Sequence, residues 1–307
     1  MEEFLKQLIE ELEERLSYTE EDYTVHQYTV CKTNDTVLHS VVIRLGDEQI
    51  SKNIYVEPYF HMNMSGTEMD EIVDAILAEN SNREGMNEVL EKFAENLDYE
   101  EVKDKIIIRV ACKELNKDYL KDKVYVEIAG TDLVAVFYIL VSMSDKGLIN
   151  TCVDEKLLKQ WGIASASDLY DVTLQNTIRL LPPEIKGMNE MIDCCDLDIV
   201  NDGMAEEVGR TMFVLTNEMG VNGATAMFYD GVLKEFAITQ NTDKVVIFPS
   251  SRHEVILLPH YKELKYESCY RMVEEVNEFV VGDMDILSNS VYIYDLATDS
   301  ISIWTEG

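Results

Sequence analysis

Leu133–Val141 (LVAVFYILV) is an uninterrupted apolar run near the middle of the chain. A run of this length that is rich in β-branched and aromatic side chains is typical of a β-strand. A membrane-spanning helix needs about 20 apolar residues, and this is the longest strongly apolar stretch. The chain also begins without a basic and apolar leader. We therefore expect a protein that lies in the cytoplasm and does not cross a membrane.

Several predicted strands are joined by short turns. Tyr23–Lys32 and Val37–Leu45 flank the turn-forming residues 33–35, and residues 291–294 and 300–304 flank a second turn. Apolar residues at helical spacing predict helices over 2–16, 68–77, 87–96, 155–161, 166–180 and 265–280. This mixture predicts an α+β fold with mixed, largely antiparallel sheets and helices packed on them.

A polar connector, Leu115–Lys121, separates two parts of this pattern. We therefore expect an N-terminal α+β subdomain over residues 1–115, made of a helix, a hairpin and further helices. A C-terminal α+β domain would cover residues 120–307.

The C-terminal half shows the same order of elements twice. Strand, turn, strand, Asp and helix follow one another from Leu133 to Trp161, and again from Phe213 to Phe236. Asp154 and Asp230 stand at the two positions where a side chain caps a helix. We therefore predict two strand–strand–helix units. The second unit includes a strand over Gly223–Tyr229.

Three segments are harder to assign from sequence. Ile106–Val110 fits either a strand or a turn of buried helix, because periodicity alone does not separate the two. Asn53–Tyr59 predicts a short extended piece, with Pro58 at its edge or end. Glu184–Asp202 is acidic and rich in Met, and it predicts a helix followed by a loop.

The chain is strongly acidic. It has 26 Lys and Arg against 59 Asp and Glu, a formal net charge of −33. Such a charge disfavours direct binding to nucleic acid or to anionic membranes. It favours a non-enzymatic binding or adaptor protein whose acidic surface meets a basic protein partner. A nucleic-acid mimic, which would occupy the groove of a DNA-binding protein, is a second form of this hypothesis.

One segment carries residue types used in catalysis. Ser250, Ser251, Arg252, His253 and Glu254 lie between two apolar strands. The alternative hypothesis is a hydrolase in which Ser250 or Ser251 is activated by His253. Because neighbouring side chains on a strand point to opposite faces or run parallel, this spacing equally fits a Ser-rich turn. Arg252, at the mouth of a strand, is the candidate for ligand binding.

We expect no metal site and no cofactor. His26 and His39 are candidates to face each other across the first hairpin, but a third ligand is missing nearby. Asp193–Asp202 lacks the Gly and Glu of a calcium loop, and Gly220–Gly223 lacks the spacing of a phosphate loop. The six cysteines form no Cys-x-x-Cys pair, so we expect free thiols.

Met212–Pro259, together with residues 161–163 and 287–292, carries a family resemblance. The sequence resembles an uncharacterised domain-of-unknown-function family of gut clostridia (Firmicutes), and it is distantly similar to YtpQ-like proteins. The resemblance implies a cytoplasmic bacterial protein of about this length. It implies no activity, cofactor or catalytic residue.

Overall fold

The computed structural model describes residues 1–46, 51–81, 93, 97–144, 147–188, 212–262 and 264–305. The chain forms two compact units. Unit 1 comprises Met1–Lys32 and Thr36–Leu97, and unit 2 comprises Thr33–Asp35 and Asp98–Gly307. Helices and largely antiparallel sheets make up both, so the predicted α+β class is confirmed.

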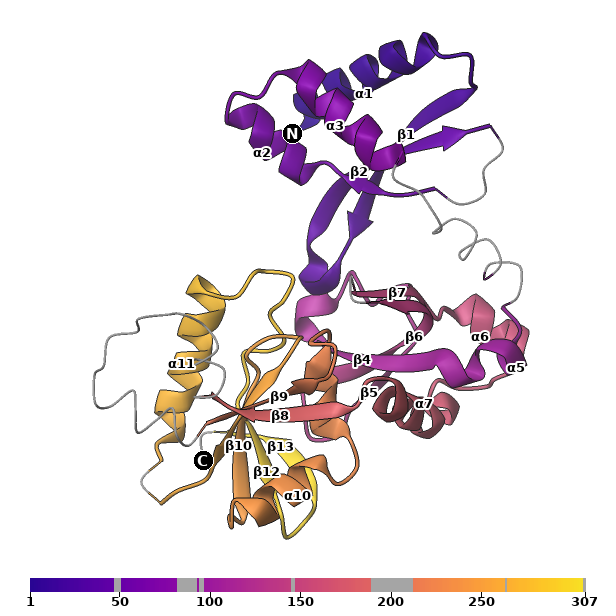
Figure 1. The fold of residues 1–307 in the computed structure, drawn as a ribbon. Coiled ribbons are helices and arrows are strands. Elements are labelled where there is room, and N and C mark those ends of the chain that lie inside the picture. Colours follow the sequence, from indigo (N-terminus) through magenta and orange to yellow (C-terminus); the bar gives the residue numbers. More distant parts are fainter. Residues whose placement is uncertain are drawn as a thin grey trace. The chain divides into compact units, whose positions relative to one another are not determined.

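Unit 1 packs helices on a three-stranded antiparallel sheet of order β1-β2-β3 (Figure 1). Its elements are α1 (Glu2–Ser17), β1 (Tyr23–Cys31), β2 (Val37–Leu45), β3 (Ile54–Tyr55), α2 (Glu57–Met64) and α3 (Met69–Ser81). Leu8 and Leu12 of α1 meet Ile43 of β2 and Ile72 and Ile76 of α3 in one buried core. The predicted first helix and first hairpin are confirmed.

Pro58 begins a helix instead of ending an extended segment. Only Ile54 and Tyr55 pair as a strand, and Pro58 stands in the first turn of α2. A proline fits there because the first amide groups of a helix have no intrahelical acceptor. The extended segment predicted over Asn53–Tyr59 is therefore wrong in its second half.

The first sheet of unit 2 is built around β6. The elements in this region are α5 (Tyr99–Val102), η2 (Lys103–Lys105), β4 (Ile106–Cys112), η3 (Glu114–Asn116), β5 (Tyr125–Glu127), β6 (Leu133–Ser144), β7 (Gly147–Cys152), α6 (Glu155–Trp161) and α7 (Ser167–Leu180). β6 pairs with β4 along one edge and with β5 and β7 along the other. The predicted strand over Leu133–Val141 is confirmed, and Ile106–Val110 is a strand.

Because β4 pairs with β6, the structure assigns residues 98–115 to unit 2, whereas the sequence prediction placed the boundary at 115–120.

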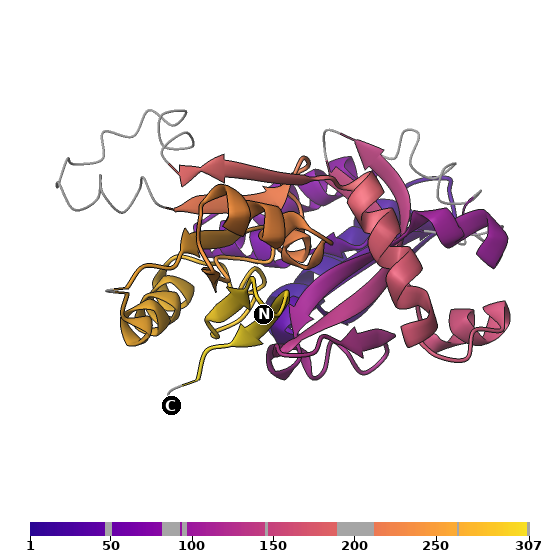
Figure 2. The ribbon, with the colours of Figure 1, turned by 90° about the horizontal axis from the view of Figure 1, so that it is seen from below.

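α7 covers the free edge of β4 (Figure 2). The amide N of Ile108 donates to Oγ1 of Thr177 at 3.0 Å, and Nδ2 of Asn176 donates to the carbonyl O of Ile106 at 3.2 Å. Polar side chains of the helix therefore satisfy backbone groups that an edge strand would otherwise leave unpaired.

The second sheet of unit 2 is antiparallel and has the order β13-β12-β10-β11-β9-β8. Its region contains β8 (Pro183–Gly187), β9 (Phe213–Asn217), η4 (Gly223–Phe228), α10 (Val232–Thr239), β10 (Lys244–Phe248), β11 (Val255–Pro259), α11 (Tyr266–Phe279), β12 (Tyr292–Asp295) and β13 (Ser300–Ile303). Cys269 and Val273 of α11 pack with Val246 and Phe248 on one face. The predicted C-terminal hairpin is confirmed.

The second of the two predicted strand–strand–helix units differs from the prediction. Gly223–Phe228 is a 3-10 helix, so the strand predicted over Gly223–Tyr229 is wrong. Gly231 takes the N-cap position of α10, which the prediction gave to Asp230. In the first unit, Oδ1 of Asp154 accepts a hydrogen bond from the amide N of Leu157 at 2.9 Å, as predicted for a cap. β6 and β9 also belong to different sheets.

Two predicted helices fall wholly or partly outside the described residues. Residues 183–187 form β8, which corrects the start of the helix predicted over Glu184–Asp202, and residues 189–202 lie outside the described ranges. Most of Asn87–Asn96 lies outside them as well. No helix in the described part of the chain combines the length and the apolar character that a membrane crossing requires.

Candidate functional site

The loop between β10 and β11 uses its serines to bind its own backbone and its own carboxylate. Oγ of Ser250 and Oγ of Ser251 both donate to Oε1 of Glu254, at 3.4 and 3.2 Å. Oγ of Ser251 also accepts a hydrogen bond from the amide N of His253 at 3.0 Å. These contacts are those of a hydrogen-bonded turn.

The imidazole of His253 faces other partners. Its Nδ1 accepts a hydrogen bond from the amide N of Asn222 at 3.3 Å, and its Nε2 lies 3.3 Å from Oδ1 of Asp285. Nε2 also lies 3.2 Å from Nε of Arg252, which approaches the same Oδ1 of Asp285. Among the described residues, neither serine hydroxyl is hydrogen-bonded to the ring. None of these contacts joins a serine to the ring of His253, as the hydrolase hypothesis requires. That hypothesis stays a prediction.

Arg252 is held in one orientation by Asp285. Its Nε lies 2.8 Å from Oδ1 of Asp285, and its amide N donates to the carbonyl O of Asp285 at 2.8 Å. Nη1 lies 3.4 Å from Oγ1 of Thr33, and 31% of the side-chain surface is exposed. The guanidinium is thus fixed along one edge, and the residue also lines a small cavity.

Arg109 lines the same cavity, and the sequence analysis did not single it out. It is the one charged residue in β4 (IIIRVAC), and its guanidinium carbon lies 4.4 Å from the ring centroid of Tyr138. Its Nε is buried without a hydrogen-bond partner in the described structure. Burial lowers the pKa of Arg109, and the nearby positive charge of Arg252 lowers it further. The sequence signal that could have identified Arg109 is a single arginine within an otherwise apolar strand.

Thr33 reaches this cavity because the turn that contains it is bound firmly within unit 2. Nδ2 of Asn34 donates to the carbonyl oxygens of Asp283 and Ile286, at 2.7 Å each. The carboxylate of Asp35 accepts from the amide N of Asp118 at 2.9 Å, and from that of Tyr119. Asn34 and Asp35 both have positive φ, a conformation that these residue types tolerate.

A second surface of interest lies on α11. Met272, Glu275, Val276 and Phe279 follow helical spacing and form what we call the α11 face. Met272 is 47% exposed and Phe279 is 77% exposed. Met272 and Val276 also line an apolar hollow of about 60 Å³ that extends to Pro249 and Ile256. Contiguous exposed apolar groups are a feature of interaction surfaces.

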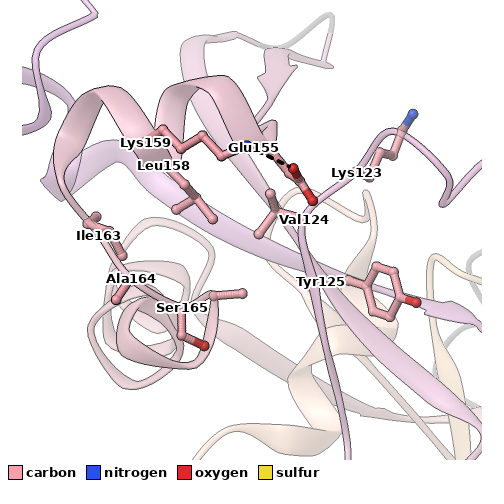
Figure 3. Close-up of a pocket in the computed structure, with 10 residues that line it drawn as sticks. Lys123, Val124, Tyr125, Glu155, Leu158, Lys159, Ile163, Ala164 and Ser165 are labelled. Carbon is pink, nitrogen blue, oxygen red and sulfur yellow. Dashed lines mark hydrogen bonds and ion pairs between the residues drawn. The ribbon is translucent and has the colours of Figure 1, made fainter.

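A wider hollow lies between α6, the segment 163–166 that leads to α7, and the segment around Val124 (Figure 3). Its volume is about 400 Å³. Nζ of Lys159 pairs with Oε2 of Glu155 at 3.3 Å, and both side chains are largely exposed. In the described structure Oγ of Ser165 accepts a hydrogen bond from the amide N of Ser167 and makes none with Glu155 or Lys159, which pair with each other, so we assign this hollow no chemistry.

Metal-binding geometry is not found in the described part of the chain, where no three His, Cys, Asp or Glu side chains gather. His26 lies opposite Val42 and His39 lies opposite Thr29, so the prediction that the two histidines face each other is wrong. The described cysteines form no disulfide: Cys31, Cys112, Cys152 and Cys269. Cys194, Cys195 and the segment 193–202 lie outside the described residues.

Comparison with known proteins gives one match. The model of a family of unknown function (DUF5688) matches residues 1–296. No curated protein and no solved structure matches the chain. The expected membership of an uncharacterised family is confirmed, and the likeness to YtpQ-like proteins stays a prediction.

Proposed function

Because the chain belongs to the DUF5688 family, whose function is unknown, we propose a role from its own residues: a non-enzymatic binding or adaptor protein that engages a basic protein partner. The observation that carries the proposal is the α11 face, where exposed apolar side chains stand among carboxylates. The partner that fits is a basic amphipathic segment, with apolar side chains for the hollow beside Met272 and with Lys or Arg for the acidic rim.

The charges of α11 support a basic partner. Its exposed ionisable side chains are mostly acidic: Glu267, Glu274, Glu275 and Glu278 against Arg271. Like-charged groups disfavour an acidic partner, whereas a basic segment gains both steering and complementarity. The net charge of −33 acts in the same direction at longer range.

The opposite side of α11 explains why the face is free to bind. Cys269 and Val273 are buried against the sheet, and Nδ2 of the buried Asn277 donates to the carbonyl O of Ser288, so this side anchors the helix. Met272 and Phe279 are therefore not needed to complete that core. Because the backbone of this helix is already ordered, a partner that covers the face orders side chains only.

A cytoplasmic location is part of this proposal. None of the described cysteines forms a disulfide, although Cys31 and Cys152 are only partly buried. Free thiols are typical of reducing compartments.

The test compares the protein with two surface variants. The tagged full chain, the double variant M272E/F279E and the control I238E are used to capture proteins from a lysate of the source organism, followed by mass spectrometry. Ile238 is 61% exposed on α10, so it is a matched control for an added surface carboxylate. We expect a basic protein to be captured by the wild type and by I238E and lost with M272E/F279E.

The same experiment has outcomes that contradict the proposal. A captured set that is unchanged in M272E/F279E would exclude the α11 face as the binding surface, and a captured partner without excess positive charge would exclude a basic partner. Release of a basic DNA-binding partner by added duplex DNA would instead indicate the nucleic-acid mimic. Exposed carboxylates lie on α1, α3 and α11, in both units, a spread that favours solvated faces over a single phosphate-like stripe.

The hydrolase alternative has its own test. Incubation of the native chain with a fluorophosphonate probe should give no labelling at Ser250 or Ser251, because both hydroxyls donate to Glu254. Labelling of the wild type that is lost in S251A or S250A would favour the hydrolase over the adaptor.

A further inference from the structure

The cavity beside Arg109 has an unusual balance of charge for so acidic a chain. Its lining contains two arginines, Arg109 and Arg252, and none of the described residues that line it is Asp or Glu. One carboxylate, that of Asp285, binds Arg252 from the side. Two guanidiniums and one carboxylate leave a local charge of 2 − 1 = +1 when His253 is neutral.

Arg109 has no anionic partner of its own among the described residues. A buried cation is costly unless an opposite charge or several acceptors compensate it. The ring of Tyr138 provides a cation–π contact, but the buried Nε stays without an acceptor. The second arginine raises this cost, because like charges repel more strongly where water is excluded.

Neutral donors surround the same cavity. Thr33 contributes a hydroxyl, and the hydroxyls of Tyr119 and Tyr138 are hydrogen-bonded to each other. One of these two tyrosine protons is used between them, so the other is available to a ligand. Burial raises the pKa of both tyrosines, which keeps them protonated as donors.

We propose that Arg109 and Arg252 form a binding site for a small oxyanion, a carboxylate or phosphate group, one oxygen of which enters the cavity. The cavity volume of about 20 Å³ holds one oxygen-sized atom. The rest of the group would lie toward Arg252, which is partly exposed. A guanidinium suits this role because its fork of N–H donors matches carboxylate and phosphate oxygens.

This proposal does not depend on the α11 face. The charge of the chain favours a small ligand over an extended one. The net charge of −33 repels extended polyanions, whereas a single anionic group is attracted by the local positive charge. Arg252 is preoriented by Asp285, and Thr33 is held by its turn, so the ligand would order few side chains on binding.

The experiment measures thermal unfolding of the full chain in sodium chloride, sodium phosphate and sodium acetate at equal ionic strength. We expect a saturable rise of about 2–4 °C in the midpoint with phosphate, with acetate or with both, relative to chloride. A response to phosphate alone identifies a phosphate group, and a response to acetate alone identifies a carboxylate. Arg109→Met and Arg252→Gln should abolish the rise, whereas the control Arg271→Gln, an exposed arginine of α11, should retain it.

A second measurement uses only the wild type, so it still tests the site if the variants fail to fold. The Nε–Hε signals of the arginines in the ¹⁵N-labelled wild type are followed by NMR during titration with phosphate and with acetate. Saturable movement of two signals supports the site. Equal stabilisation in all three salts, a rise that persists in Arg109→Met, or arginine signals that do not move would overturn it and leave Arg109 as a structural cation over Tyr138.

Discussion

The hydroxyl of Tyr292 donates a hydrogen bond of 2.5 Å to Oδ1 of Asp132, a residue 160 positions earlier in the chain. Ser288 and Ser290 donate to Oδ2 of the same carboxylate, at 2.7 and 3.1 Å. Asp132 directly precedes β6, and Tyr292 begins β12. One carboxylate with three hydroxyl donors therefore joins the two sheets of unit 2.

Tyr292→Phe should lower the free energy of unfolding by about 2 kcal/mol, because it removes a hydrogen bond to a partly buried charge. Tyr294→Phe is the matched control on the same strand, since its hydroxyl donates to Asp299, whose side chain is 55% exposed. We expect a clearly smaller loss for the control. Urea unfolding measures both, and equal losses would show that Asp132 does not join the sheets.

Gly223→Ala should destabilise the chain by about 2 kcal/mol through overpacking. A Cβ atom there would lie 2.2 Å from Oγ1 of Thr216 and 2.5 Å from the carbonyl O of His253. Gly162→Ala meets no atom within 4 Å but has a φ of +71°, so it should cost about 1 kcal/mol from backbone strain alone. Thermal or urea unfolding that ranks Gly162→Ala above Gly223→Ala would contradict this packing.

Asp154→Ala should cost about 1 kcal/mol, because its side chain caps α6. Asp154→Asn should recover most of this loss. Asp230→Ala serves as the control, since the exposed Asp230 precedes Gly231 and its carboxylate accepts only from the side chain of Gln175 in the described structure. A loss for Asp230→Ala as large as that for Asp154→Ala would indicate that Asp230 caps α10, as the sequence predicted.

The stability of the chain should decrease in alkaline solution. Burial raises the pKa of Cys112 and of Cys152 from 9.0 to about 11. Between these values the unfolded chain loses the proton and the folded chain keeps it, so the unfolded state binds fewer protons and unfolding becomes easier as pH rises. The contribution is fully present below pH 9 and is lost by about pH 11.

The slope that each thiol contributes is at most about 1.4 kcal/mol per pH unit. Urea unfolding of the wild type and of C112A/C152A at intervals from pH 7 to pH 11 measures it. We expect the double variant to show a shallower decrease between pH 9 and pH 11. Parallel curves would mean that other groups cause the decrease.

Local sequence patterns predicted elements that depend on the chain near them. The apolar run at Leu133–Val141, the amphipathic spacing of residues 2–16 and the Asp154 cap each became the element expected. They succeeded because periodicity and capping act over a few residues. The strand predicted over Gly223–Tyr229 failed: the segment is a 3-10 helix in which the amide N of Ala224 donates to the carbonyl O of Arg252, a long-range contact that local periodicity does not report.

The candidate sites divide in the same way. The sequence alone indicated a strongly acidic chain and drew attention to Arg252 and His253, because charge and residue type do not depend on the fold. Only the tertiary structure showed that the serine hydroxyls donate to Glu254. It also showed that Arg109 of β4 and Arg252 of a loop line the same cavity. The distance between those two arginines depends on how the two sheets of unit 2 pack, and packing is a property of surfaces that meet only after the strands have formed.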